Sequence, residues 1–140
     1  MLSRFVVHQH KTGRTHFDLR VICRGVLRSW SLLREPPQKA GEKRLAIERE
    51  SYTAVSINSR TFEEDAFGAG RVHEWDSGDV EIRELSGEHL ILTFHGSRLV
   101  GDYEIRRTKW YPGNRWMLTR GQRKQFGLTE SPNPLEPKSK

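Results

Sequence analysis

The chain has 140 residues, a length typical of one domain, and 34% of them are hydrophobic, which suffices for a core of modest size. The net charge of +6 and a sequence pI near 9.8 indicate an anionic partner, with nucleic acid as the first candidate. The sequence has no apolar run of about 18 residues and no basic amphipathic helix, so a membrane partner is not expected. A single cysteine, Cys23, excludes an internal disulfide; without a signal peptide, a cytoplasmic location is expected.

The first two expected strands are Arg4–His10 and Thr15–Cys23, with a turn between them. Apolar and polar residues alternate along the second strand, which predicts one face toward the core and one polar face. Cys23 falls on the apolar face and is interpreted as a small core residue and not as a nucleophile.

The polar face of this hairpin carries the strongest functional signal. A three-residue loop at Thr12–Arg14 would set His10 opposite His16 and His8 opposite Asp18. A two-residue loop would put the two facing histidines on opposite sides of the sheet. Two imidazoles and one carboxylate suit a divalent metal and leave half of an octahedron open.

Two other readings of these residues stay open at this point. The polar face can be a solvated surface with Asp18–Arg20 ion pairs and no metal. Alternatively, His16 and Asp18 with His95 and Arg106 downstream imitate the order of an iron and 2-oxoacid oxygenase, although the chain is short for that fold.

The rest of the chain predicts further short strands with glycine or proline turns between them. The expected strands are Val26–Leu33, Lys43–Glu50, Arg71–Trp75, Val80–Leu85, His89–Phe94, Arg98–Lys109 and Arg115–Thr119. Asp76–Asp79 and Phe67–Gly70 are expected to be tight turns, and the polar stretch up to Asp65 a loop with room for a short helix. Such regular spacing predicts an all-β, mainly antiparallel barrel or sandwich over residues 1–120. Residues 121–140 contain three prolines and few apolar side chains, and are expected to be a disordered tail.

An ordered set of segments resembles one known family, the phosphoesterase domain of bacterial DNA ligase D and its free-standing relatives. Residues 10–20 carry the histidines, Asp18 and Arg20 at matching positions, and the resemblance continues in the same order to about residue 120. The other matching segments are Gly25–Ser31, Lys43–Ile47, Phe67–Val72, Trp75–Gly78, His95–Leu99 and Arg115–Trp116. The resemblance implies a compact β-barrel with a groove on one side and manganese-dependent removal of 3′-phosphates and 3′-terminal ribonucleosides from DNA ends.

The resemblance also implies roles for individual residues. His10, His16 and Asp18 match the metal ligands of the family. The positions implied to bind the substrate phosphate are Arg14, Arg20, Arg34, Arg44 and Glu50, with arginine at position 34 in place of a lysine. The partners implied are DNA or RNA–DNA 3′ ends and a DNA ligase or end-joining protein, and a monomer is expected.

Two positions depart from the family pattern. Tyr52 stands where the family has an essential histidine, and Ser56 where it has an essential tyrosine. His8, on the expected site face, is the candidate substitute proton donor. The alternative to an active phosphoesterase is therefore a catalytically weak or silent module of the same fold that binds DNA ends.

Overall fold

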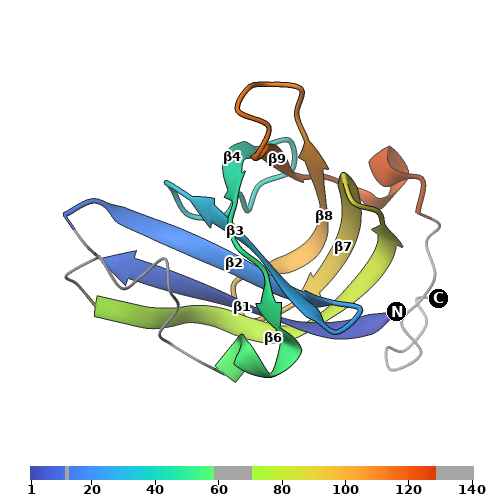
Figure 1. Cartoon of the computed structure of the whole chain (residues 1–140). Helices are drawn as coiled ribbons and strands as arrows, with labels where there is room; N and C mark the ends of the chain where they lie inside the picture. The colour runs from blue at the N-terminus through green and yellow to red at the C-terminus, as the bar shows by residue number, and fades with distance from the viewer. Residues whose placement is uncertain (12, 59–70, 129–140) are drawn as a thin grey trace.

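The computed structural model describes residues 1–11, 13–58 and 71–128, and within them nine antiparallel strands form one sheet. Eight of them form a closed barrel in which each strand pairs with the next in the order β2-β1-β6-β7-β8-β9-β4-β3-β2 (Figure 1). The ninth strand, β5, extends one edge of β3. The bounds are β1 (Leu2–Lys11), β2 (Thr15–Cys23), β3 (Val26–Leu32), β4 (Lys43–Glu48), β5 (Tyr52–Thr53), β6 (Arg71–Leu85), β7 (His89–His95), β8 (Val100–Arg107) and β9 (Arg115–Arg120). The expected mainly antiparallel β-barrel is confirmed.

The barrel interior is filled by the apolar faces of the strands. Its aromatic rings meet edge to face, with centroids 4.8 Å apart for Phe5 and Phe94 and 5.5 Å apart for Trp30 and Trp116. Cys23 is a buried core residue, as expected, and burial raises the pKa of its thiol to about 11. Other members of this core are Val7, Phe17, Leu19, Val21, Leu32, Trp75, Leu90, Leu92, Tyr103, Ile105 and Leu118.

Strand β6 corrects one expectation, because residues 76–79 form no turn and the strand runs unbroken from Arg71 to Leu85. The Asp76 carboxylate accepts hydrogen bonds from the backbone N–H groups of residues 97, 98 and 99, at 3.0, 3.0 and 2.7 Å, and so fixes the neighbouring β7–β8 turn. A side chain at Gly78 would lie 2.7 Å from the His95 carbonyl oxygen. The aspartate and glycine that resemble turn residues therefore serve contacts with the next strand.

Two β-bulges shape the same strand. Val7 is opposite Asp76 while His8 is opposite Glu74, so Trp75 is an extra residue, and a second register shift lies between Ile82 and Glu84. Because of the first bulge, the Trp75 side chain is buried in the core while Glu74 stays paired with His8.

The remaining described elements are two short 3-10 helices, η1 (Ala54–Asn58) and η3 (Arg123–Phe126). Helix η1 contacts β2 and β3, and it is the short helix allowed for in the polar stretch. Among the described residues, no helix is long and apolar enough to cross a membrane. The expected turn Phe67–Gly70 lies outside the described residues.

Residues 121–128, the described part of the expected tail, contact the barrel. The Gly121 N–H donates to the Asp102 carbonyl at 3.1 Å, and the Arg123 guanidinium lies 3.6 Å from the Asp102 carboxylate. The Phe126 ring lies against Gly121, where any side chain would overlap it. The three prolines that prompted the expectation all lie beyond residue 128, outside the described part of the chain.

Candidate functional site

The hairpin of β1 and β2 sets the histidines in the predicted register. His10 is paired with His16 and His8 with Asp18, and Lys11 pairs with Thr15, which leaves a three-residue loop. Directly opposed residues of an antiparallel pair share one face of the sheet. The four side chains consequently lie on the outer face of the barrel wall, as the loop length predicts.

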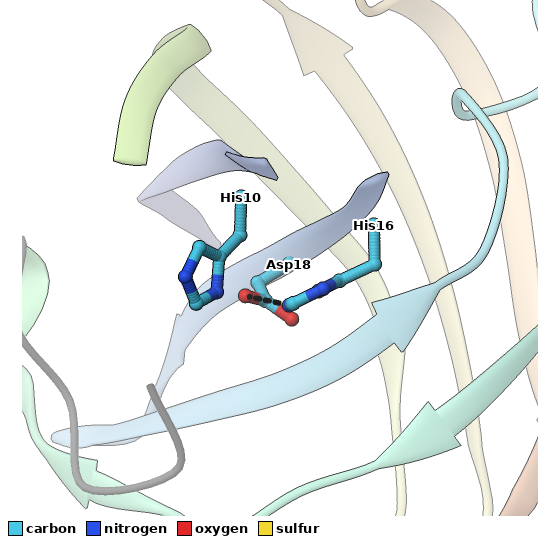
Figure 2. A group of neighbouring side chains, drawn as sticks. All are labelled: His10, His16 and Asp18. Carbon is cyan, nitrogen blue, oxygen red and sulfur yellow. Dashed lines mark hydrogen bonds and ion pairs between the residues drawn. The ribbon is translucent and has the colours of Figure 1, made fainter. Parts of the chain in front are cut away.

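Three of these residues converge. One ligand atom from each of His10, His16 and Asp18 can be chosen so that all lie within 4.8 Å of one another. The His16 Nε2 atom lies 3.1 Å from Asp18 Oδ2, and the two imidazole rings have centroids 4.8 Å apart (Figure 2). His10 and Asp18 are buried, whereas 23% of the His16 side chain is exposed. The group is therefore open to solvent on the His16 side.

Strand β3 supports the carboxylate from the other side. Ser31 Oγ donates to Asp18 Oδ1 at 2.6 Å. Arg20 Nη2 lies 3.6 Å from Asp18 Oδ2, and Arg20 Nη1 donates to Ser29 Oγ at 3.0 Å. The buried carboxylate is thus held by an imidazole, a hydroxyl and a guanidinium.

These contacts decide the ionisation of Asp18. Burial raises its pKa, but the His16 hydrogen bond, the Arg20 charge and the Ser31 hydroxyl together outweigh burial. The net pKa lies below the ordinary aspartate value, so the group is a carboxylate at neutral pH. An ionised carboxylate beside two imidazoles is the donor set that divalent transition metals bind.

His8 lies in the same row of the sheet as Asp18. Its Cα is paired with Asp18 on one side and with Glu74 on the other, and its side chain is 2% exposed. The structure therefore brings His8 beside the group of three, although it does not belong to the set of converging ligand atoms.

A groove of about 430 Å³ opens next to this group. Three arginines from different elements line it: Arg14 from the β1–β2 loop, Arg49 after β4, and Arg115 at the start of β9. Its remaining lining residues are His16, Ser31, Leu33, Leu45 and Ile47. The groove thus joins an apolar floor and three cations to the exposed edge of the site, an arrangement that suits a phosphodiester chain with its sugars and bases.

Of the five residues expected to bind phosphate, two lie at the groove or the site and three lie away from the groove. Arg14 lines the groove, and Arg20 lies fully buried beneath Asp18. Arg34 is exposed in the loop after β3 and is not a lining residue of the groove. Arg44 donates to the Glu35 and Lys43 carbonyls, on the face of β4 opposite the groove-lining Leu45 and Ile47. Glu50 is exposed beyond the end of β4.

Sequence reasoning missed four contributors. Ser31 and Ser29 are the Cα partners of Asp18 and Arg20 in the β2–β3 pairing, and the Ser-x-Ser pattern on β3 was the available signal. Arg49 and Arg115 carried no comparable signal, because only barrel closure brings the end of β4 beside the start of β9.

The two positions expected to depart from the family pattern, Tyr52 and Ser56, lie near the site face. Tyr52 on β5 is paired with Leu27 on β3. Leu27 is in turn paired with Ile22 on β2, which lies two residues after Arg20. Ser56 belongs to η1, and its hydroxyl lies 3.3 Å from that of Thr53. The segment carrying both substitutions thus contacts the two strands that hold Asp18, Arg20 and Ser31.

The oxygenase reading finds no support in the geometry. His95 Nε2 lies 2.9 Å from Glu81, and Arg106 Nη2 donates to Glu104 at 3.0 Å. Neither residue joins the converging ligand atoms of His10, His16 and Asp18.

Comparison with known proteins identifies the family of the chain. The model of the DNA ligase D 3′-phosphoesterase domain matches residues 8–107. The multifunctional non-homologous end joining DNA repair protein LigD of Mycobacterium tuberculosis H37Rv is 33% identical over 126 residues, which cover 84% of this chain and 16% of that protein. The LigD proteins of Mycolicibacterium smegmatis and Pseudomonas aeruginosa are 30% and 31% identical, over 84% and 76% of this chain and 17% and 14% of their own lengths. The chain thus spans about a sixth of these relatives, and it belongs to the DNA ligase D 3′-phosphoesterase domain family.

Proposed function

We propose that the chain processes DNA 3′ ends in a metal-dependent reaction, by removing 3′-phosphates, 3′-terminal ribonucleosides or both, in the repair of DNA breaks by end joining. The observation that carries this proposal is the convergence of His10, His16 and Asp18 at the edge of an arginine-lined groove. Membership of the phosphoesterase family and the names of the end-joining relatives support the same assignment.

His10, His16 and Asp18 are the proposed metal ligands. Their donor set suits manganese, iron or zinc, and the family resemblance favours manganese. A divalent metal supplies Lewis-acid polarisation of a phosphoryl oxygen when bound. Ser31 and Arg20 orient the Asp18 carboxylate, so the ligand set is held in place before the metal arrives.

The groove arginines have a separate proposed role. Arg14, Arg49 and Arg115 attract the phosphates of the substrate strand and place its 3′ end beside His16. Arg20 is 0% exposed, so we assign it to positioning Asp18 and not to the phosphate contact that the resemblance implies. If Arg20→Ala weakens binding of 3′-phosphorylated and 3′-hydroxyl ends equally, a specific role on the terminal phosphate is excluded.

The proton donor is the part of the proposed machinery in which this chain departs from the family pattern that the resemblance implies. Because Tyr52 replaces the family histidine, His8 is the nearby imidazole that can hold a proton for the leaving group. A positioned general acid contributes about 10²–10⁴-fold to a rate. We therefore expect slow turnover, with His8→Ala lowering the rate and leaving metal affinity unchanged.

The decisive experiment incubates the protein and manganese with a primer–template that carries a 3′-phosphate or a single 3′-ribonucleoside. Release of phosphate or nucleoside, abolished by EDTA and by His10→Ala, is the expected result. Binding of metal and DNA ends without any product identifies the silent module instead. In that case the Tyr52→His variant tests whether only the general acid is missing. If it is, this variant should form product while its metal affinity stays unchanged.

A further inference from the structure

The loop between β8 and β9, residues 108–114, presents two neighbouring aromatic side chains to solvent. Trp110 is 53% exposed and Tyr111 is 92% exposed. The other three tryptophans are core residues with at most 7% exposure. An adjacent Trp–Tyr pair on a surface is a feature of binding sites, because such rings are otherwise largely buried.

These rings lie in a second groove, which we call the β8–β9 groove, of about 710 Å³. Among its lining residues, three are cations (Arg106, Arg107 and Lys109) and one is a carboxylate (Glu88). Two of the cations have acidic neighbours, since Arg106 lies 3.0 Å from Glu104 and Arg107 lies 3.9 Å from Glu88. The lining side chains carry three cations against one carboxylate, and two further carboxylates, Glu84 and Glu104, border the groove at His89. The contribution of charge to binding a polyanion is therefore modest, and the exposed rings carry most of the argument.

The loop is tied down while its aromatic side chains face outward. The Thr108 N–H donates to the Arg115 carbonyl at 2.8 Å, and Arg107 Nε donates to the Gly113 carbonyl at 2.8 Å. Within the loop, the Gly113 N–H donates to the Trp110 carbonyl at 3.0 Å. A platform ordered in advance loses little conformational entropy when a ligand stacks on it.

The position of the loop links the two grooves. It protrudes from the barrel at the top of Figure 1 and leads directly into Arg115, which lines the groove beside His16. The two grooves are therefore close along the chain, since Gly113 lines one and Arg115 lines the other.

We propose that the β8–β9 groove binds unpaired nucleotides of a DNA strand. Bases stack on Trp110 and Tyr111, and Arg107 and Lys109 contact the phosphates between them. Paired bases in a duplex are stacked on their neighbours and do not offer their faces, whereas single strands do. This binding site goes beyond the proposed 3′-end chemistry and stands whether or not the metal site is active.

Fluorescence titration with a short oligo(dT) strand in EDTA tests the proposal without catalysis. Stacking should quench the emission of Trp110, and the same quench should be absent in Trp110→Phe, which retains a ring and should bind within a few-fold of the native protein. Trp110→Ala and Tyr111→Ala should each weaken binding by roughly 5- to 150-fold. Lys109→Ala should lower the slope of log affinity against log salt by about 0.7.

Two controls keep the result interpretable. Arg4→Ala removes an exposed cation that lies outside both grooves, paired with Asp79 at 3.9 Å, and should leave the affinity for oligo(dT) within two-fold. A blunt duplex of equal length should lose little affinity in Trp110→Ala. The proposal is overturned if oligo(dT) affinity is unchanged in the Trp110→Ala, Tyr111→Ala double variant, or if duplex and single strand lose affinity equally. Neither outcome touches the 3′-end assay, so the two proposals fail separately.

Discussion

The two faces of β1 and β2 are both buried, but by different means. The inner face packs Phe5, Val7 and Leu19 against the core, where each is 0% exposed. On the outer face, the polar residues His8, His10, Asp18 and Arg20 are each at most 2% exposed. Apolar burial stabilises the barrel without demanding particular partners, whereas a buried charge is tolerated only with a partner in place. The positions of the polar side chains on the outer face are therefore determined by particular hydrogen bonds and ion pairs, whereas the inner face requires only close apolar packing.

The largest expected effect is the loss of a ligand on the outer face. His10→Ala should remove measurable manganese binding by isothermal titration calorimetry and remove 3′-end processing with it. The metal-free variant should retain the far-ultraviolet circular dichroism of the barrel, because the imidazole is not part of the core cluster. Unchanged manganese affinity would show that the proposed site is wrong.

On the inner face, Trp30→Ala should destabilise the fold by about 3–5 kcal/mol. The ring is fully buried and packs edge to face on Trp116, so its removal leaves a cavity that the closed barrel fills poorly. Urea denaturation of the metal-free protein gives the free energy of unfolding directly. A loss below about 1 kcal/mol would mean that the core relaxes around the cavity.

A matched pair on β3 separates ligand positioning from general packing. Ser31→Ala removes the hydroxyl that donates to Asp18 and should weaken manganese affinity by about 10- to 100-fold. Ser29→Ala, two residues away, removes a contact of Arg20 instead and should weaken it far less. The manganese affinity of both variants is measured by calorimetric titration. An equal loss of affinity in the two variants would show that the Ser31 hydroxyl has no special role in positioning Asp18.

The smallest effect belongs to the groove beside the site. Arg49→Ala should reduce the salt dependence of DNA-end binding by about one counterion and weaken affinity a few-fold. Arg44→Ala is the control, because Arg44 lies on the other face of β4 and is bonded to carbonyls. A larger loss from Arg44 than from Arg49 in filter-binding titrations across salt would redirect the substrate path away from this groove.

The sequence predicted the site hairpin well because the register of a hairpin depends only on residues close together in the chain. Alternation along Thr15–Cys23 and the length of one loop determine the face and register of His10, His16 and Asp18. The spacing of strands and turns predicted an antiparallel barrel or sandwich, and the family resemblance implied the barrel that the structure shows.

Features that depend on contacts between distant segments were not predictable in this way. Asp76 and Gly78 resemble turn residues, yet the first fixes the β7–β8 turn and the second admits the β7 backbone. Arg44 was expected to bind phosphate from the family resemblance, but it lies on the face of β4 opposite the groove. Arg49 and Arg115 line the groove from elements that meet only when the barrel closes. The exposure of Trp110 likewise depends on a loop anchored to Arg115.

The three-residue loop has a consequence for the order of folding. All three proposed ligands fall within nine positions of one hairpin, whereas closure pairs Lys43 with Thr119, more than half the chain apart. Hairpins form in about 1–10 μs, and sheets dominated by distant pairings fold in roughly milliseconds to seconds. A metal ion can therefore be captured while the barrel is still open, and manganese present during refolding should speed the slow phase in stopped-flow fluorescence. An identical rate with and without manganese would place metal capture after closure.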